Sequence, residues 1–318
     1  MKTGIGMLLL ALGVSVSAAQ AQTGKWPVKP VRVITPFAAG GSVDVVARML
    51  AAPLSEEYGQ QFIVDNRGGA TIGAELAALA KPDGYTFILG ASAYTSSAAL
   101  YKLPYDPVKG VTPVSMVNIG PLIVTVNPSM KAENFKEFLE LLRSKPGAFN
   151  FGSPGTGSGA HLASALFQQM SGINMVHVPY KSDALAMGDL LSGQVHVIFA
   201  SGPALLPMAK AGKLRMLAVT TEKRWPTLPE LPAVGEFVPG YQNTAWHGVW
   251  GPAGIPKDIV ARLNQSIVRI LKTPSVQERL RADGREPTYS TPEEFGRIIE
   301  RDVAKWKKVV QLANIKLE

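Results

Sequence analysis

Cysteine is absent from the 318-residue sequence, which excludes a thiol nucleophile, a cysteine-ligated zinc or iron–sulfur site and a lipid-modified cysteine. Charged residues make up only 18% of the chain, and the formal net charge is +8. No run of Lys and Arg interleaved with aromatic residues occurs, so no nucleic-acid partner is expected. The composition instead indicates a folded protein, 46% hydrophobic, whose basic surface favours small anions.

The amino terminus has the pattern of an export signal. Lys2 precedes an apolar stretch over residues 5–16, and Ala19-Gln20-Ala21 has the small residues of a signal-peptidase site. A membrane anchor is the alternative, but this stretch is shorter than the roughly 20 apolar residues that span a bilayer. We therefore expect residues 1–21 to be a signal peptide, cleavage after Ala21, and a periplasmic location.

Short β-rich runs alternate with helical patterns along the rest of the chain, which is typical of βα units around parallel sheets. The series occurs twice and is followed by helices only. Strands are expected at residues 31–35, 62–65, 86–90, 115–126, 149–152, 175–178, 195–200 and 214–220, with an extended segment at 244–250. Helices are expected at residues 43–58, 72–80, 135–144, 160–170, 184–191, 204–211, 256–271, 275–281 and 291–312.

The final helices must bury their apolar faces on an existing core, and the first βα series is the expected one. The chain would then cross between the two series near residues 122–127 and 246–251. This predicts an α/β protein with two Rossmann-like lobes joined by two extended hinge crossings. Lobe 1 is expected to hold residues 22–122 and 248–318, and lobe 2 residues 123–247. Two independent domains on a linker are the alternative, but no flexible polar linker separates the halves.

Two Gly-rich turns between a strand and a helix, at residues 36–44 and 152–161, point to anion binding. Each would place backbone N–H groups at a helix start, where unpaired donors and the helix dipole favour an anion. One turn lies in each lobe, so one carboxylate or phosphate could be held from both sides. Tight turns without a ligand are the alternative interpretation. His161 could orient the loop or ligand or be satisfied by backbone, and Asp44 could stabilise its helix or contact ligand.

Neither a cofactor nor catalysis is expected from the motifs. Residues 155–160 fit a G-x-G-x-x-A dinucleotide pattern, but no acidic residue ends the next strand, and no Lys follows Gly157 as a P-loop requires. The sequences G-x-S-x-G and H-E-x-x-H do not occur, and the four histidines have no metal-ligand spacing.

The sequence resembles the substrate-binding proteins of tripartite tricarboxylate transporters, the Bug family. The similarity covers essentially the whole mature chain in order. The matching segments are Trp26-Pro27-Val28-Lys29-Pro30-Val31-Arg32, Pro36-Phe37 with Gly40-Gly41 and Asp44, Val64-Asp65-Asn66-Arg67, Lys81-Pro82-Asp83-Gly84-Tyr85-Thr86, Val126-Asn127-Pro128-Ser129, Gly155-Thr156-Gly157-Ser158 with His161, Val178-Pro179-Tyr180-Lys181, and Asp189-Leu190-Leu191-Ser192-Gly193-Gln194-Val195.

This resemblance implies a type II periplasmic binding protein that closes on a small organic carboxylate and delivers it to membrane permease subunits. A monomer is expected, and a partner that is a sensor rather than a permease is the alternative. The implied ligand-binding residues belong to the two Gly-rich loops or follow strand ends. They are Ala38, Ala39, Gly40, Gly41, Ser42, Asp44, Ser92, Tyr94, Ser153, Gly155, Thr156, Gly157, Ser158, His161, Asp183 and Ser201.

The sequence departs from the family pattern at Lys181-Ser182-Asp183-Ala184, at His196 and at Ala200-Ser201-Gly202-Pro203. These differences concern the identity of the ligand rather than the fold. If Asp183 faces the cleft, its carboxylate would repel a second acid group on the ligand. The alternative is that Ser182 or Asp183 caps the following helix.

Overall fold

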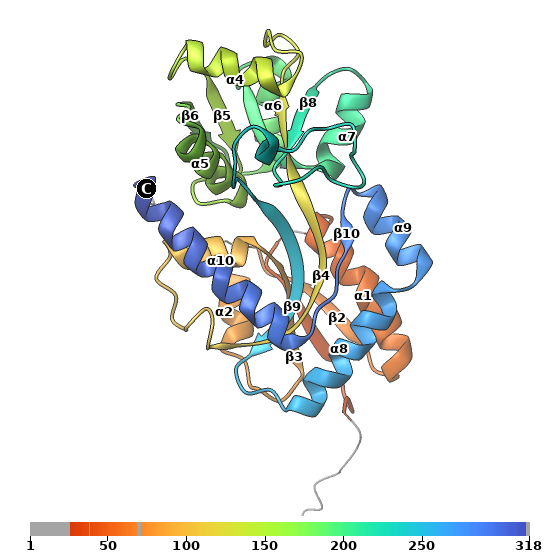
Figure 1. The fold of residues 1–318 in the computed structure, drawn as a ribbon. Coiled ribbons are helices and arrows are strands. Elements are labelled where there is room, and N and C mark those ends of the chain that lie inside the picture. The colour runs from red at the N-terminus through yellow and green to blue at the C-terminus, as the bar shows by residue number, and fades with distance from the viewer. Residues whose placement is uncertain (1–25, 38, 69–70, 316–318) are drawn as a thin grey trace, which may run out of the picture.

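The computed structural model describes residues 26–37, 39–68 and 71–315. It is an α/β protein with two lobes, one above the other in Figure 1. The expected signal peptide and Ala38 lie outside the described residues. A single long strand, β4 (Val111–Val126), runs through both lobes and takes part in both of their sheets.

Lobe 1 is built on a sheet in the order β2-β1-β3-β9-β4, with β10 paired to the outer edge of β4. The strands β1 (Val31–Thr35), β2 (Phe62–Asn66) and β3 (Thr86–Ala91) are parallel. The strand β9 (Thr244–Pro252) is antiparallel to both β3 and β4. The short β10 (Glu286–Pro287) corrects the expectation that only helices follow residue 250.

Lobe 2 has a smaller sheet in which β4 pairs with β7 and β8, and β5 lies between β7 and β6. Its strands are β5 (Asn150–Ser153), β6 (Val176–Pro179), β7 (Val197–Ser201) and β8 (Arg215–Val219). The strands β5, β6 and β7 are parallel to one another, and β7 and β8 are antiparallel to β4.

Helices cover both faces of both sheets. In lobe 1, α1 (Ser42–Tyr58), α8 (Lys257–Leu271) and α9 (Pro274–Ala282) share one apolar core, and α2 (Ile72–Ala78), α3 (Ala93–Leu100) and α10 (Pro292–Leu312) share the other. In lobe 2, α4 (Phe135–Ser144) and α5 (Gly159–Ser171) lie opposite α6 (Asp183–Ser192) and α7 (Gly202–Lys210). The final helices α8, α9 and α10 thus share the two apolar cores of lobe 1.

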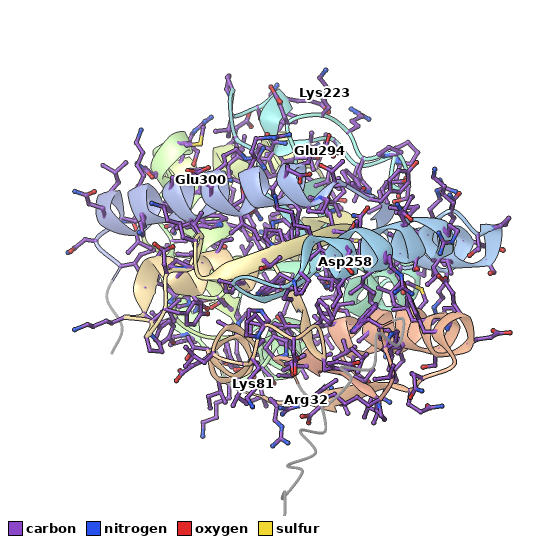
Figure 2. The ribbon with its side chains drawn as sticks, turned by 90° about the horizontal axis from the view of Figure 1, so that it is seen from below. Arg32, Lys81, Lys223, Asp258, Glu294 and Glu300 are labelled. Carbon is purple, nitrogen blue, oxygen red and sulfur yellow. The ribbon has the colours of Figure 1, made fainter. Side chains whose placement is uncertain are left out.

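The surface of lobe 1 is charged where these helices meet solvent. Figure 2 shows the molecule from below, with Asp258 near the start of α8 and Glu294 and Glu300 on α10, all three exposed. The opposite stripe of α10 is apolar, and Phe295, Ile299 and Val303 are buried against the sheet of lobe 1. Farther along α10, Trp306 and Val309 contact Leu162 of α5, so this helix touches both lobes.

The two crossings lie side by side. Pairing of β4 changes from β9 to β7 and β8 between Pro121 and Leu122, close to the expected first crossing. The second was expected near residues 246–251, but those residues already pair within the sheet of lobe 1, and β9 begins at Thr244. The backbone of Asn243 bonds to Thr220, which ties the end of one crossing to the end of β8.

Helix α3 was not expected. Its sequence, Ala93–Leu100, has small and hydroxylated residues on all sides and no apolar stripe that would have indicated a helix. This fits its position, since residues 94–98 are all buried. Thr95 and Ser96 donate their hydroxyl protons to the backbone oxygens of Ser92 and Ala93. These local bonds satisfy polar groups that a buried helix would otherwise leave without partners.

Candidate functional site

The carboxyl ends of the parallel strands of the two lobes face each other. Strand β4 leaves lobe 1 for lobe 2, and β3 runs in the same direction, because both are antiparallel to β9. In lobe 2, β5, β6 and β7 run the opposite way to β4, toward lobe 1. The loops that follow β1, β3, β5, β6 and β7 therefore lie at the ends of the two sheets that face each other, where open α/β sheets bind ligands.

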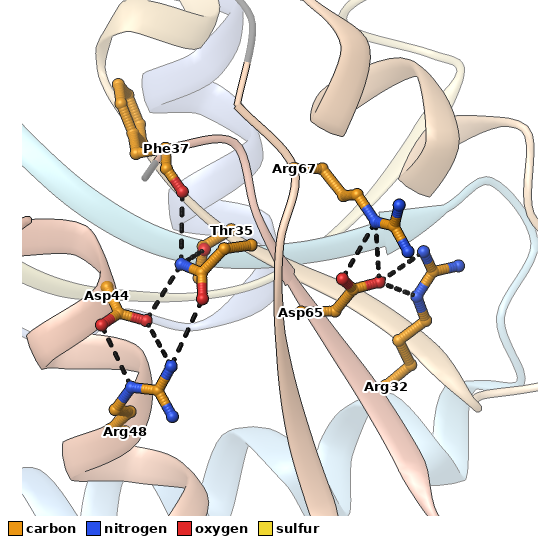
Figure 3. Close-up of polar contacts among 8 residues, drawn as sticks. Arg32, Thr35, Phe37, Asp44, Arg48, Asp65 and Arg67 are labelled. Carbon is orange, nitrogen blue, oxygen red and sulfur yellow. Dashed lines mark hydrogen bonds and ion pairs between the residues drawn. The ribbon is translucent and has the colours of Figure 1, made fainter. Parts of the chain in front are cut away.

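The first Gly-rich loop, residues 36–41, is held from behind by Asp44. Gly40 has φ +81°, a left-handed conformation that favours glycine, and its N–H donates to Asp44 Oδ2 over 2.9 Å. Arg48 Nε and Asn66 Nδ2 donate to the same carboxylate, both over 3.0 Å (Figure 3). The bond from Arg48, with those from Gly40 and Asn66, lowers the pKa of Asp44 to about 2.

Asp44 therefore supports the loop. It was expected among the ligand contacts, but it is 3% exposed and both of its oxygens already accept protein donors. Asn66 extends this support because its Nδ2 also donates to Thr35 Oγ1 over 2.7 Å and to the backbone oxygen of Phe37. Next to this network, Asp65 forms ion pairs with Arg32 and Arg67 (Figure 3).

In the second Gly-rich loop, residues 153–158, a glycine N–H is again bonded to a side chain of the following helix, here a histidine. Gly157 also has φ +81°, and its N–H donates to Nδ1 of His161 over 2.9 Å. Ser158 caps α5, its Oγ accepting from the N–H of His161 over 3.2 Å. Ser153 Oγ donates to the backbone oxygen of Gly155, whose φ is +120°.

The donors left for an anion are those at the two helix starts. The first N–H groups of a helix have no acceptor within it. Because α1 has no side-chain cap, those of Ser42, Val43 and Asp44 remain. In α5 the cap takes the N–H of His161, which leaves those of Gly159 and Ala160. The amides of Gly40 and Gly157 are already used within their loops, so these glycines shape the site. Ala39, Gly41 and the side chain of Ser42 are exposed, and Thr156 is half-buried.

A cavity of about 50 Å³ lies between the lobes at the start of α5. Ser92 and Ser96 line it from lobe 1, Gly159 and Ala160 from lobe 2, and Asn243 from the hinge, together with Leu122, Ala245 and Trp306. Asn243 is 5% exposed, and within the part of the chain that the structure describes its side-chain amide has no hydrogen-bond partner. The cavity has room for a carboxylate group or one to two waters, at roughly 30 Å³ per water. Asn243 and Ser96 have no sequence signal, because only the folded hinge brings them to α5.

Three further expected residues have different placements. Tyr94 was expected to contact the ligand, but its side chain is buried in the core of lobe 1 because it lies on helix α3. Its hydroxyl donates to Pro107 O over 2.7 Å, and its ring centroid is 4.7 Å from that of Trp250. Ser201 is half-buried at the carboxyl end of β7. Asp183 is the first residue of α6 and exposed, whereas Ser182 supplies the cap, accepting from Leu185 N–H over 3.4 Å.

Among the described residues, no group of three or more His, Asp or Glu side chains could hold a metal ion. No helix in the described ranges combines the length and apolarity needed to cross a membrane.

Comparison with known proteins decides the family. The family model described as tripartite tricarboxylate transporter family receptor matches residues 46–315. The chain belongs to this family. BugT of Bordetella pertussis is 33% identical over 320 residues, which cover 99% of this chain and 97% of BugT. The resemblance to Bug proteins and the two-lobed periplasmic-binding fold are thereby confirmed.

Two similar proteins have solved structures with a carboxylate, adipate in one and malate in the other. R. palustris Rpa4515 with adipate is 38% identical, with a TM-score of 0.83, and the match covers 92% of this chain and 99% of that one. MatC from Rhodopseudomonas palustris with bound malate is 30% identical, with a TM-score of 0.79, and the match covers 90% of this chain and 100% of that one. The family is one of solute-binding receptors rather than enzymes.

Proposed function

We propose that this protein captures a small organic carboxylate between its lobes in the periplasm and delivers it to the permease of a tripartite tricarboxylate transporter. The observation that carries the proposal is the pair of helix starts at α1 and α5. Each helix start follows a glycine with φ +81° and has N–H groups without an acceptor in its own helix. The strands that precede the two helices point toward each other. The helix dipoles and open donors favour an anion there.

The size and charge of the site narrow the ligand class. The interlobe cavity accommodates one carboxylate group next to α5, and the adipate and malate of the two similar structures are dicarboxylates. Asp183 follows β6 at the same interlobe end and would favour a ligand with a donor or amino group near it. We infer that the loops bind the common carboxylate and that residues such as Asp183 and Ser201 select the rest.

The proposal also includes export of the chain to the periplasm and a membrane permease as its partner. Residues 1–21 would direct the chain to the periplasm and be removed after Ala21, and the protein would act as a monomer that presents its closed form to the permease. Amino-terminal sequencing of the protein from its native host tests the cleavage. Gln22 as the first residue supports it, and an intact Met1 in the cytosolic fraction contradicts it.

Calorimetry tests the ligand class directly. Protein freed of bound molecules by partial unfolding and refolding is titrated with adipate, malate and adipamide, the uncharged diamide with the length of adipate. We expect at least one dicarboxylate to bind and adipamide to bind at least tenfold more weakly, because each hydrogen bond to a charged acceptor is worth about 1.5–3 kcal/mol. Equal binding of adipate and adipamide, or no binding of either carboxylate, would contradict the proposal.

A further inference from the structure

Two stacked histidines lie beneath the second Gly-rich loop. His161 is on α5 and His177 is on β6, and their ring centroids are 3.9 Å apart with planes inclined by only 6°. Phe151 of β5 continues the stack, with its centroid 4.9 Å from that of His177. Three successive elements of lobe 2 thus meet in one aromatic column under residues 153–158.

Hydrogen bonds connect both histidine rings to the second Gly-rich loop. His161 Nδ1 accepts from the N–H of Gly157, so the ring proton of His161 is on Nε2. His177 Nε2 is 2.7 Å from Ser153 Oγ, which is in turn 3.0 Å from the backbone oxygen of Gly155. Ser153 thus links the His177 ring to the backbone of the loop. Both rings are neutral, and each is tied to one end of the loop.

The surroundings keep both rings neutral. Burial lowers the pKa of each histidine to about 4, and the proximity of His177 contributes further for His161. On the neighbouring elements, Tyr241 donates to Ala163 O of α5 over 3.1 Å, and Tyr180, after β6, donates to Asp189 of α6 over 2.7 Å. Asp183 at the start of α6 and Lys305 on α10, which packs on α5, make no hydrogen bond or ion pair to either ring. Within the described residues, no carboxylate bonds to either imidazole to favour its charged form.

We propose that His161 and His177 are positioning residues of the carboxylate site: as a neutral pair, they fix the second Gly-rich loop in the conformation that presents the start of α5 to the ligand. The inference rests on the proposed function. Protonation of His161 would remove the acceptor for Gly157, and two cationic rings in contact would repel each other. Acid would therefore release the loop and weaken ligand binding through the protein, in addition to any titration of the ligand.

The first test is calorimetric binding of adipate at pH 7.5 to wild type, His161→Ala, His161→Asn and Tyr241→Phe. His161→Ala should bind at least tenfold more weakly, because Gly157 loses its acceptor. Asn can accept from Gly157 with its Oδ1 and should recover part of the affinity. Tyr241→Phe is the matched control: it removes a buried bond to the same helix, so it should melt at a lower temperature and bind adipate like wild type.

The second test separates positioning from stability by pH. Adipate titrates equally for every variant, so we compare the ratio of dissociation constants at pH 4.0 and pH 7.5. Wild type should lose at least about twofold more affinity than His161→Asn, because about half of the rings are protonated near a pKa of about 4. If His161→Ala does not fold, Ser153→Ala, which frees His177 and the Gly155 carbonyl, replaces it.

The outcomes distinguish this inference from the proposed function. Folded His161→Ala that binds adipate like wild type, or equal pH ratios for wild type and His161→Asn, would overturn the positioning role while leaving the carboxylate site intact. Failure of wild type to bind adipate and malate would instead overturn the proposed function, and the positioning role with it.

Discussion

The two Gly-rich loops share one construction and differ in the group that holds them. In each, a glycine with φ +81° donates its N–H to a side chain four residues later, on the first turn of the following helix. In lobe 1 this acceptor is the carboxylate of Asp44, and in lobe 2 it is the neutral imidazole of His161. The comparison shows that backbone shape at an anion site can be fixed by either a charged or an uncharged acceptor, with different sensitivity to pH.

The largest effect is expected at Asp44. Asp44→Ala removes one acceptor from Gly40, Arg48 and Asn66 together and should cost about 3 kcal/mol of folding free energy, since bonds to charged groups contribute about 1.5–3 kcal/mol each. Asp65→Ala is the matched control, because Asp65 also pairs with two arginines but at the surface, and it should cost below about 1 kcal/mol. Urea denaturation measures both. Equal losses would show that Asp44 is an ordinary surface ion pair.

As the pH falls, the second Gly-rich loop should lose its supporting hydrogen bond before the first loop does. The pKa of His161 falls from 6.5 to about 4 on folding, so its stabilising contribution is complete above pH 6.5 and is lost as the pH falls toward 4. The pKa of Asp44 falls from 3.8 to about 2, so its contribution persists down to about pH 4 and is lost only toward pH 2. The expected cost at His161 is about 3 kcal/mol, from about 1.4 kcal/mol per pKa unit.

Hydrogen exchange of the Gly157 and Gly40 amides, followed by NMR, measures the pH at which each loop loses this bond. The Gly157 amide should lose protection, relative to its intrinsic exchange rate, between pH 6 and 4, while the Gly40 amide keeps its protection over the same range. Simultaneous loss at both would mean that global unfolding, rather than the local acceptors, sets the pH dependence.

The glycine conformations give a smaller, paired effect. Gly40→Ala has open space around the added methyl group but must keep φ +81°, which costs about 1–2 kcal/mol. Gly41→Ala keeps φ −75°, which any residue adopts, and should change stability by less than about 0.5 kcal/mol. Thermal unfolding of the two variants checks the difference. A Gly41→Ala variant as unstable as Gly40→Ala would show that space rather than backbone conformation decides.

Periodicity and turn residues account for what the sequence predicts well. Apolar spacing located most strands and helices, and the run of glycines located both loops, because few residues other than glycine adopt positive φ. The support by Asp44 and His161 has a usable signal, a polar side chain four residues after the loop glycine. No pattern in the sequence indicates that Asn243 lines the cavity or that Tyr94 is buried. Both facts depend on how the hinge and α3 pack in three dimensions.

The smallest effect on stability is expected at Asp183. Asp183→Asn should leave the melting temperature nearly unchanged, because Ser182 and not Asp183 caps α6. If its charge selects ligands, the ranking of mono-, di- and amino-carboxylates in thermal-shift assays changes, with dicarboxylates gaining relative to amino acids. The same ranking for both proteins would remove Asp183 from the ligand site.

The central claim is that one carboxylate lies between the starts of α1 and α5, and amide chemical shifts during an adipate titration test it most directly. The largest changes should occur at the amides of Ser42, Val43, Asp44, Gly159 and Ala160, whose N–H groups have no acceptor in either helix. Gly40 and Gly157 should move less, because their N–H groups stay bonded to Asp44 and His161. Changes confined to one lobe, or absent from both helix starts, would contradict the shared site.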